Sequence, residues 1–228
     1  MKSLIQVAGV IDKEEAQMIM NAGVHYLGFP LRLPVNKEDT TEEDAAEIIK
    51  TITHPHRAVL ITYLDNADEI IEFCDKLNVK IVQLHGKITK KELIKIKSQR
   101  PDLEIFKSLV VAENNFEELV VTLNLLSPYV DAFITDTFDP ATGAEGATGK
   151  THDWKISRKL VELSPKPVII AGGLNPSNVK KAIMEIRPAG VDVHTGVEGK
   201  DGRKDPELVK RFVEEAGEGF GAILKVFF

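Results

Sequence analysis

Cysteine is almost missing from this chain, and Cys74 is the single example in 228 residues. One cysteine excludes an internal disulfide and a cysteine-rich metal site. Long hydrophobic runs are missing too, because no apolar stretch approaches the roughly 18 residues that a membrane helix needs. The first residues lack the long apolar region and the cleavage site of a signal peptide. We therefore expect a cytoplasmic protein with no membrane partner.

Basic patches rich in aromatic residues are absent, and the formal net charge is −6. Nucleic acid is therefore not an expected partner. No cluster of His, Asp and Glu has metal-ligand spacing, and the first apolar run is followed by Gly9 but not by a dinucleotide fingerprint. We expect neither a metal nor another cofactor. What remains is a globular composition, with 43% hydrophobic and 28% charged residues.

Short apolar runs alternate regularly with amphipathic stretches of helical spacing. The near-continuous hydrophobicity of the runs is typical of strands that are buried on both faces. The expected strands are Leu4–Ala8, Val24–Phe29, Ala58–Tyr63, Val79–Leu84, Leu103–Val110, Val130–Thr135, Pro167–Ala171 and Val191–Val193. The expected helices are Lys13–Asn21, Asp39–Ile52, Asn66–Leu77, Thr89–Ser98, Phe116–Leu126, Lys155–Leu163, Pro176–Arg187 and Pro206–Ala216.

Strict alternation of strands and helices predicts a parallel sheet with crossover helices. The number of units matches a closed (β/α)8 TIM barrel in a single domain, whereas the alternative, an open doubly wound sheet, usually has about five or six strands. We expect the barrel to span residues 1–216. Residues 217–228 are interpreted as an apolar tail that packs on the barrel or on a neighbouring chain, and a homodimer is left open.

One connection between an expected strand and the next helix is much longer than the others. It covers Asp136–Asp153 and contains Gly143, Gly146 and Gly149. Loops that leave the carboxyl ends of the strands build the active face of a TIM barrel. We therefore interpret this segment as a mobile lid rather than as a simple surface insertion.

Two glycine turns predict a phosphate site. Gly172 and Gly173 follow the seventh expected strand and precede a helix, so the backbone can approach an anion at a helix N-terminus. Thr195 and Gly196 follow the eighth strand in a similar way. TIM barrels commonly hold a phosphate at these two strand ends. Either turn alone could be only structural, but their joint occurrence favours a phosphate ligand.

Titratable side chains stand at three other strand ends. Asp136 ends the sixth expected strand, His85 follows the fourth, and His194 follows the eighth. Because the active residues of a TIM barrel lie at the carboxyl ends of its strands, these three are the candidate catalytic residues. Arg32 and Gln83 are the candidates for binding the rest of the substrate.

Five segments together resemble the phosphoribosylanthranilate isomerase family, namely Val82–Gly86, Asp136–Thr137, Gly149–Trp154, Ala171–Val179 and Val191–Glu198. The likeness covers nearly the whole chain. It implies a TIM-barrel isomerase of tryptophan biosynthesis, which converts N-(5'-phosphoribosyl)anthranilate to an aminoketose by an Amadori rearrangement without a cofactor. The resemblance also implies that Asp136 is the general acid that protonates the ring oxygen, and that the glycine turns hold the phosphate of this small phosphorylated sugar.

The chain departs from the family pattern at two places. The first strand of the family carries a cysteine general base that removes the proton from C2 of the sugar, and Ala8 stands there in this chain. Pro34–Asp39 replaces the family's segment whose arginine binds the anthranilate carboxylate, and Arg32 is not in register with that arginine. Loss of a general base typically costs about 10²–10⁴ in rate. His194 or His85 would have to replace it.

Three functions remain open at this point. The first is isomerisation of a phosphorylated sugar, with anthranilate kept or replaced by another group. The second is non-catalytic binding of a phosphosugar by a pseudoenzyme. The third, an epimerase or aldolase on the same barrel, rests on fold analogy, and a Schiff-base aldolase would need Lys107. Asp136, the long loop and the paired turns favour the enzyme.

Overall fold

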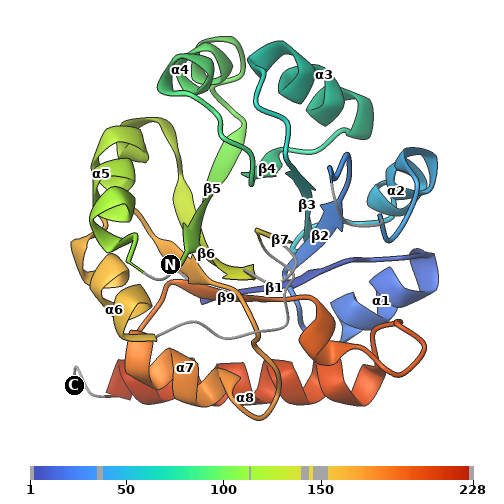
Figure 1. The fold of residues 1–228 in the computed structure, drawn as a ribbon. Coiled ribbons are helices and arrows are strands. Elements are labelled where there is room, and N and C mark those ends of the chain that lie inside the picture. Colours follow the sequence, from blue (N-terminus) through green and yellow to red (C-terminus); the bar gives the residue numbers. More distant parts are fainter. Residues whose placement is uncertain (1–2, 35–37, 113, 140–143, 146–153, 226–228) are drawn as a thin grey trace.

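Eight parallel strands close into a barrel in the computed structural model, which describes residues 3–34, 38–112, 114–139, 144–145 and 154–225 (Figure 1). The strands are β1 (Leu4–Ala8), β2 (Tyr26–Pro30), β3 (Arg57–Thr62), β4 (Ile81–Leu84), β5 (Glu104–Val111), β6 (Ala132–Asp139), β8 (Val168–Ile170) and β9 (Gly190–Val193). Each pairs in parallel with its neighbour, and β9 pairs with β1, so the ring closes. The predicted TIM barrel is confirmed.

Eight α-helices surround these strands in the described part of the chain. They are α1 (Lys13–Asn21), α2 (Glu42–Ile49), α3 (Ala67–Leu77), α4 (Lys90–Gln99), α5 (Phe116–Leu126), α6 (Trp154–Leu163), α7 (Val179–Ile186) and α8 (Pro206–Lys225), with short 3-10 helices η1 (Ser127–Tyr129) and η2 (Thr195–Val197). The first four are preceded by a polar N-cap residue whose side chain accepts a hydrogen bond from a backbone N–H of the first turn. These N-cap residues are Asp12, Thr41, Asn66 and Thr89.

Side chains along each strand point alternately into the barrel and outward to the helices. On β1, Ile5 and Val7 belong to the apolar layer between strands and helices, whereas Leu4 and Ala8 belong to the layer inside the barrel. This alternation places polar side chains inside as well. Gln6, between Ile5 and Val7 on β1, is fully buried. The barrel interior therefore holds a polar side chain of β1 together with a cluster of apolar ones.

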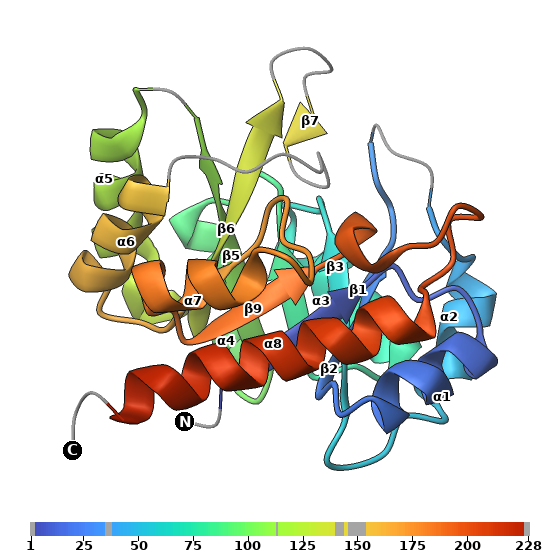
Figure 2. The same ribbon diagram turned by 90° about the horizontal axis from the view of Figure 1, so that it is seen from below.

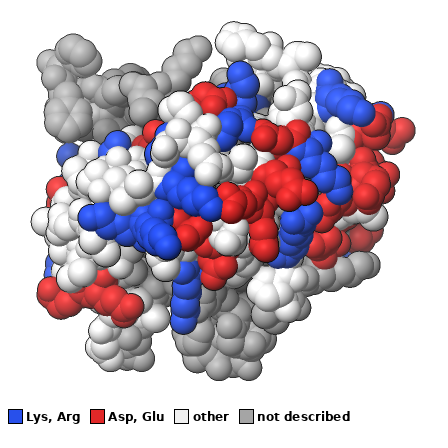
Figure 3. All heavy atoms as spheres, turned by 90° about the horizontal axis from the view of Figure 1, so that it is seen from above, with Lys and Arg blue, Asp and Glu red and all other residues white. Residues whose placement is uncertain are grey.

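The surface over α3 and α4 carries acidic and basic side chains side by side (Figure 3). Lys95 on α4 lies 2.5 Å from Asp68 on α3, and Lys97 lies 2.6 Å from Asp131. Exposed pairs of this kind contribute about 0–1 kcal/mol each, so the apolar layers supply most of the stability. No helix in the described part of the chain is long and apolar enough to cross a membrane.

The last described helix, α8, continues past the boundary expected at Gly217. It runs without a break to Lys225 and lies along the outside of the barrel beside α7 (Figure 2). Phe220 is buried, and Lys180 of α7 lies 2.6 Å from Glu218 of α8. The first part of the expected tail is therefore helix that packs on the barrel.

The long connection after β6 begins as a hairpin. Strand β7 (Ala144–Glu145) pairs antiparallel with the end of β6, where Phe138 opposes Glu145. Gly143, Gly146 and Gly149 lie outside the described residues, and so does most of the segment up to residue 153. A lid at this position therefore stays a prediction.

Candidate active site

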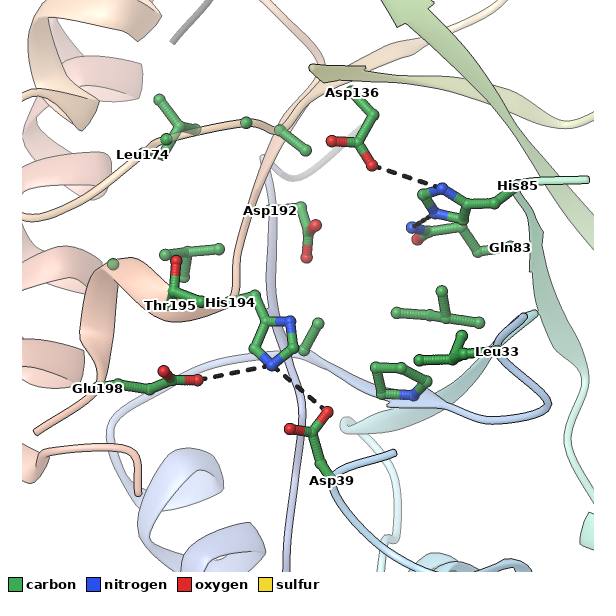
Figure 4. Close-up of a pocket in the computed structure, with 18 of the residues that line it drawn as sticks. Leu33, Asp39, Gln83, His85, Asp136, Leu174, Asp192, His194, Thr195 and Glu198 are labelled. Atoms are coloured by element: carbon green, nitrogen blue, oxygen red, sulfur yellow. Dashed lines mark hydrogen bonds and ion pairs between the residues drawn. The ribbon is translucent and has the colours of Figure 1, made fainter. Parts of the chain in front are cut away.

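A cavity of about 260 Å³ opens at the carboxyl ends of the strands (Figure 4). All three predicted catalytic side chains, Asp136, His85 and His194, line it, although they come from β6, the end of β4 and the end of β9. The four residues predicted to hold phosphate, Gly172, Gly173, Thr195 and Gly196, line it as well. Closure of the barrel brings these distant parts of the sequence to one place.

Two hydrogen bonds link Gln6, Gln83 and His85 across the barrel interior, and His85 faces Asp136. The side-chain amide of Gln6 donates to Oε1 of Gln83 over 2.8 Å. The amide of Gln83 donates to Nε2 of His85 over 2.7 Å. The other ring nitrogen of His85, Nδ1, lies 3.4 Å from Oδ2 of Asp136. All four side chains are buried, so these contacts fix the orientation of the His85 ring beside the Asp136 carboxyl group.

His85 is held as a neutral imidazole. Its Nε2 accepts a hydrogen bond from Gln83, so the ring proton sits on Nδ1, the atom that faces Asp136. Burial, and then the positive charge of Lys107, lower the pKa of His85 to about 3. With one nitrogen accepting from an amide and the other carrying a proton, both ring nitrogens of His85 are engaged in this arrangement.

Asp192 on β9 also points into the cavity, between Asp136 and His194 (Figure 4). The residue is 8% exposed, and its Oδ1 atom has no hydrogen-bond partner among the described residues. Burial raises the pKa of Asp192 to about 6. A hydrogen bond from Gln6 and the positive charges of His194 and Lys204 lower this pKa, but by less than burial raises it. A carboxyl group in this environment can exchange a proton close to neutral pH.

His194 joins loops that are far apart in the sequence. Its Nε2 lies 3.4 Å from Oδ2 of Asp39 and 3.5 Å from Oε1 of Glu198, and Glu198 in turn accepts from the buried amine of Lys204 over 2.6 Å. The ring covers Gly9, where an added Cβ would come within 2.1 Å of Nε2. Two carboxylates thus face one ring nitrogen of His194, Nε2.

Asp39 belongs to the same group of charges. Its burial would raise the pKa of the carboxyl, but the hydrogen bond and charge of His194 and the charge of Lys204 outweigh that effect and hold the pKa below its usual range. Asp39 and Asp192 therefore sit in the same cavity with opposite shifts, one stabilised as a carboxylate and the other favoured as a neutral acid.

The two glycine turns lie against each other at one side of the cavity. Gly172 and Gly173 have φ angles of +93° and +64°, in the left-handed region that favours glycine. Their N–H groups donate to no acceptor in the described part of the chain, and the Asn178 amide donates to the Gly173 carbonyl over 2.9 Å. A Cβ on Gly196 would lie 1.8 Å from the carbonyl oxygen of Leu174, so the second turn packs directly on the first.

Two basic residues singled out in the sequence point away from the cavity. The Arg32 guanidinium lies 2.8 Å from Glu42 and 3.8 Å from the centre of the Phe73 ring. The Lys107 amine is buried and donates to the backbone carbonyl of Leu84 over 3.1 Å, and neither residue lines the cavity. Gln83, the other candidate for substrate binding, does line it.

Sequence reasoning missed three acidic residues of the cavity, Asp192, Asp39 and Glu198. For Asp192 a signal existed, since one carboxylate interrupts the apolar run Val191–Val193 and the alternation of a strand turns it away from both valines. Asp39 was expected to begin a helix, but α2 begins at Glu42 and leaves Asp39 in a loop, and Glu198 also lies in a loop. Only the folded barrel brings them to His194.

Comparison with known proteins gives one consistent result. The family model described as N-(5'phosphoribosyl)anthranilate (PRA) isomerase matches residues 5–215. Among curated relatives, N-(5'-phosphoribosyl)anthranilate isomerase 2 of Methanosarcina mazei is 36% identical over 217 residues, which cover 95% of each chain.

Solved structures agree with these relatives. Phosphoribosyl anthranilate isomerase from Thermotoga maritima superposes with a TM-score of 0.79 at 25% identity, covering 95% of this chain and 99% of that one. A second structure, of monomers generated from the dimeric enzyme of T. maritima, gives a TM-score of 0.78 at 26% identity over the same shares of the two chains.

Proposed function

The chain belongs to the phosphoribosylanthranilate isomerase family, and on that premise we propose that it converts N-(5'-phosphoribosyl)anthranilate to the aminoketose of tryptophan biosynthesis by an Amadori rearrangement. One observation supports this proposal most directly. Asp136, oriented by His85, lines the same cavity as two glycine turns that lie against each other. A site of this kind can hold the phosphate end of a sugar and offer a carboxyl group to its ring.

The phosphate binds at the two turns in this proposal. Gly172 and Gly173 offer N–H groups that donate to no acceptor in the described chain, and Thr195 and Gly196 offer the start of η2. Backbone N–H groups that converge in this way favour an anion. Asn178 keeps the first turn in place through the Gly173 carbonyl. Binding the phosphate there leaves the sugar ring to extend towards Asp136.

Asp136 opens the ring. As the C1–O bond of the ring breaks, Asp136 gives its proton to the ring oxygen, and the nitrogen lone pair forms a C1=N Schiff base. His85 presents its Nδ1–H to the resulting carboxylate and is a positioning residue, because it stays neutral. Gln83 and Gln6 fix the ring behind it.

The second half of the reaction removes the proton from C2. The family's cysteine is Ala8 here, and a methyl group accepts no proton. Both histidines expected to replace it have one ring nitrogen directed at a carboxyl group of the cavity. His85 faces Asp136 with its protonated nitrogen, and His194 directs Nε2 at Asp39 and Glu198. The acidic side chains of the cavity are further candidates for the proton acceptor.

We extend the proposal to a homodimer in the cytoplasm. It is supported by the T. maritima relative, which is described as dimeric, and by the biosynthetic role of the family. Light scattering after size-exclusion chromatography checks the assembly, and a mass of one chain, 25.2 kDa, contradicts it.

Turnover of N-(5'-phosphoribosyl)anthranilate by the purified chain tests the proposal, together with Asp136→Asn and a matched surface control, Asp68→Asn. We expect wild-type turnover and unchanged turnover in the control, because Asp68 is an exposed residue of α3. Asp136→Asn should lower kcat by about 10²–10⁴, the usual contribution of general acid catalysis. Competitive inhibition by inorganic phosphate should stay within a few-fold of wild type.

Three results would contradict this. An inactive wild-type chain that still binds phosphate would favour the pseudoenzyme. Full activity of Asp136→Asn would remove its acid role. Loss of phosphate inhibition in Asp136→Asn would mean that this side chain organises the site instead of serving the chemistry.

A further inference from the structure

The space left by Ala8 is next to a buried carboxyl group. Ala8 lies at the end of β1 and lines the cavity. Strand β9 is the neighbour of β1 in the barrel, and Gln6 of β1 is the register partner of Asp192. Because alternate side chains share a face, Gln6 and Ala8 point to the same side of β1. Asp192 therefore enters the cavity on the strand beside the vacant position.

Asp192 differs from the other acidic residues of the cavity in its contacts. Asp136 faces the protonated nitrogen of His85, and Asp39 and Glu198 both face His194. Asp192 is only 8% exposed, and one of its carboxyl oxygens, Oδ1, has no hydrogen-bond partner among the described residues. The carboxyl group as a whole lines the cavity between Asp136 and His194, so its accessible part can meet a substrate atom (Figure 4).

We propose that Asp192 is the general base that removes the C2 proton and so replaces the missing cysteine of the first strand. The inference rests on the proposed function, since it names the acceptor for the second half of that reaction. Gln6, His194 and Lys204 are the groups that act on the Asp192 carboxyl, and together they counter the cost of an ionised carboxylate in the barrel interior.

The step balances without a further reactant. After ring opening, C1 is doubly bonded to nitrogen. An oxygen of Asp192 takes the proton from C2, the C2–H electron pair becomes the C1=C2 bond, and the C=N electron pair returns to nitrogen. The enaminol then becomes the ketone when C1 gains a proton and the C2 hydroxyl loses one. The product is an isomer of the substrate, in which the C1–O bond of the ring is broken and hydrogen atoms and double bonds have moved.

The ionisation of Asp192 agrees with this role. Burial raises its pKa to about 6, so at pH 7.5 most of the molecules carry the carboxylate while the group remains a stronger base than an exposed aspartate. If Asp192 must be ionised, kcat/KM falls about tenfold per pH unit below its pKa.

The test compares wild type with Asp192→Asn, with Ala8→Cys, and with the double variant that carries both changes. Asp192→Asn keeps the shape of the side chain and removes the base, so kcat should fall by about 10²–10⁴. KM and the inhibition by inorganic phosphate should change by no more than a few-fold. The double variant should regain at least about tenfold in kcat, with a new acidic limb in its pH profile that belongs to the thiol.

Rescue by the thiol separates chemistry from structure, because a residue that only supports the fold would not be replaced by a cysteine on another strand. Wild-type turnover with full activity of Asp192→Asn would overturn this inference and leave the proposed function standing. Loss of activity in both Asp192→Asn and the double variant, with phosphate inhibition also lost, would overturn it in favour of a structural role. An inactive wild-type chain would overturn both.

Discussion

Asp192→Asn should make the protein more stable while it impairs catalysis. The folded state raises the pKa of this carboxyl from 3.8 to about 6, chiefly because burial penalises the ionised form. Each pKa unit corresponds to about 1.4 kcal/mol, so at pH 7.5 the buried carboxylate costs up to about 3 kcal/mol of folding free energy. Asparagine is neutral and similar in shape, and it removes that cost.

The sign follows from proton binding. Between about pH 4 and pH 6 the folded state binds the proton of Asp192 more tightly than the unfolded state, so wild type gains stability as pH falls through this window. The advantage of Asp192→Asn should therefore be largest above pH 6. At pH 5 it should be about half of its value at pH 7.5. Urea unfolding at both pH values measures it, and at neutral pH the Tm should rise by several degrees.

Asp39→Asn is the matched control, because it changes the same residue type in the same cavity. The pKa of Asp39 is held below its usual range, so its carboxylate stabilises the folded state above the unfolded pKa, and its removal should lower the free energy of unfolding at pH 7.5. If Asp192→Asn lowered stability at pH 7.5, or if its effect did not depend on pH, the carboxyl would be well paired in the folded protein. Its proposed role as an available base would then lose its physical basis.

Three further outcomes can be measured. Gly196→Ala should weaken inhibition by inorganic phosphate about tenfold or more, because its Cβ would come within 1.8 Å of the Leu174 carbonyl oxygen, whereas Gly221→Ala, with no atom within 4 Å, should leave it unchanged. His85, with a pKa lowered to about 3, should show no titration in NMR spectra between about pH 5 and pH 8, and a midpoint near 6.5 would contradict its buried neutral state. Cys74, whose pKa burial raises to about 12, should react with a thiol reagent only when urea unfolds the chain, and rapid labelling of folded protein would contradict this.

Local patterns were sufficient for most of the secondary structure. The expected strand Leu4–Ala8 and the expected helices Lys13–Asn21 and Phe116–Leu126 have the bounds of β1, α1 and α5. Apolar periodicity and helix caps lie within a few residues of the elements they define, so they can be read along the chain. The barrel then follows from the number of alternating units. The tail expected from Gly217 was harder to read, because its glycines lie within what is one continuous helix, α8.

Some residues of the candidate site could also be predicted from the sequence, and others could not. Asp136, His85 and the glycine turns could be named from the sequence because each stands at the end of an apolar run, and a barrel brings all such ends to one face. Arg32 stands near such an end too, but the backbone turns there with a φ angle of +55° and its guanidinium pairs with Glu42 on the outside. Proximity along the chain did not decide the direction of that side chain.

The sequence by itself therefore determined the strands, the helices, the closed barrel and the positions where a phosphate and an acid could act. The tertiary structure decided how the candidate side chains are paired and buried. His194 becomes a link between loops because Asp39 and Glu198 reach its ring, and His85 stays neutral because the barrel buries it beside Lys107. Asp192 becomes a candidate base because closure of β9 on β1 buries its carboxyl next to Ala8. Ionisation depends on burial and on charges from distant segments, and these exist only after the barrel has closed.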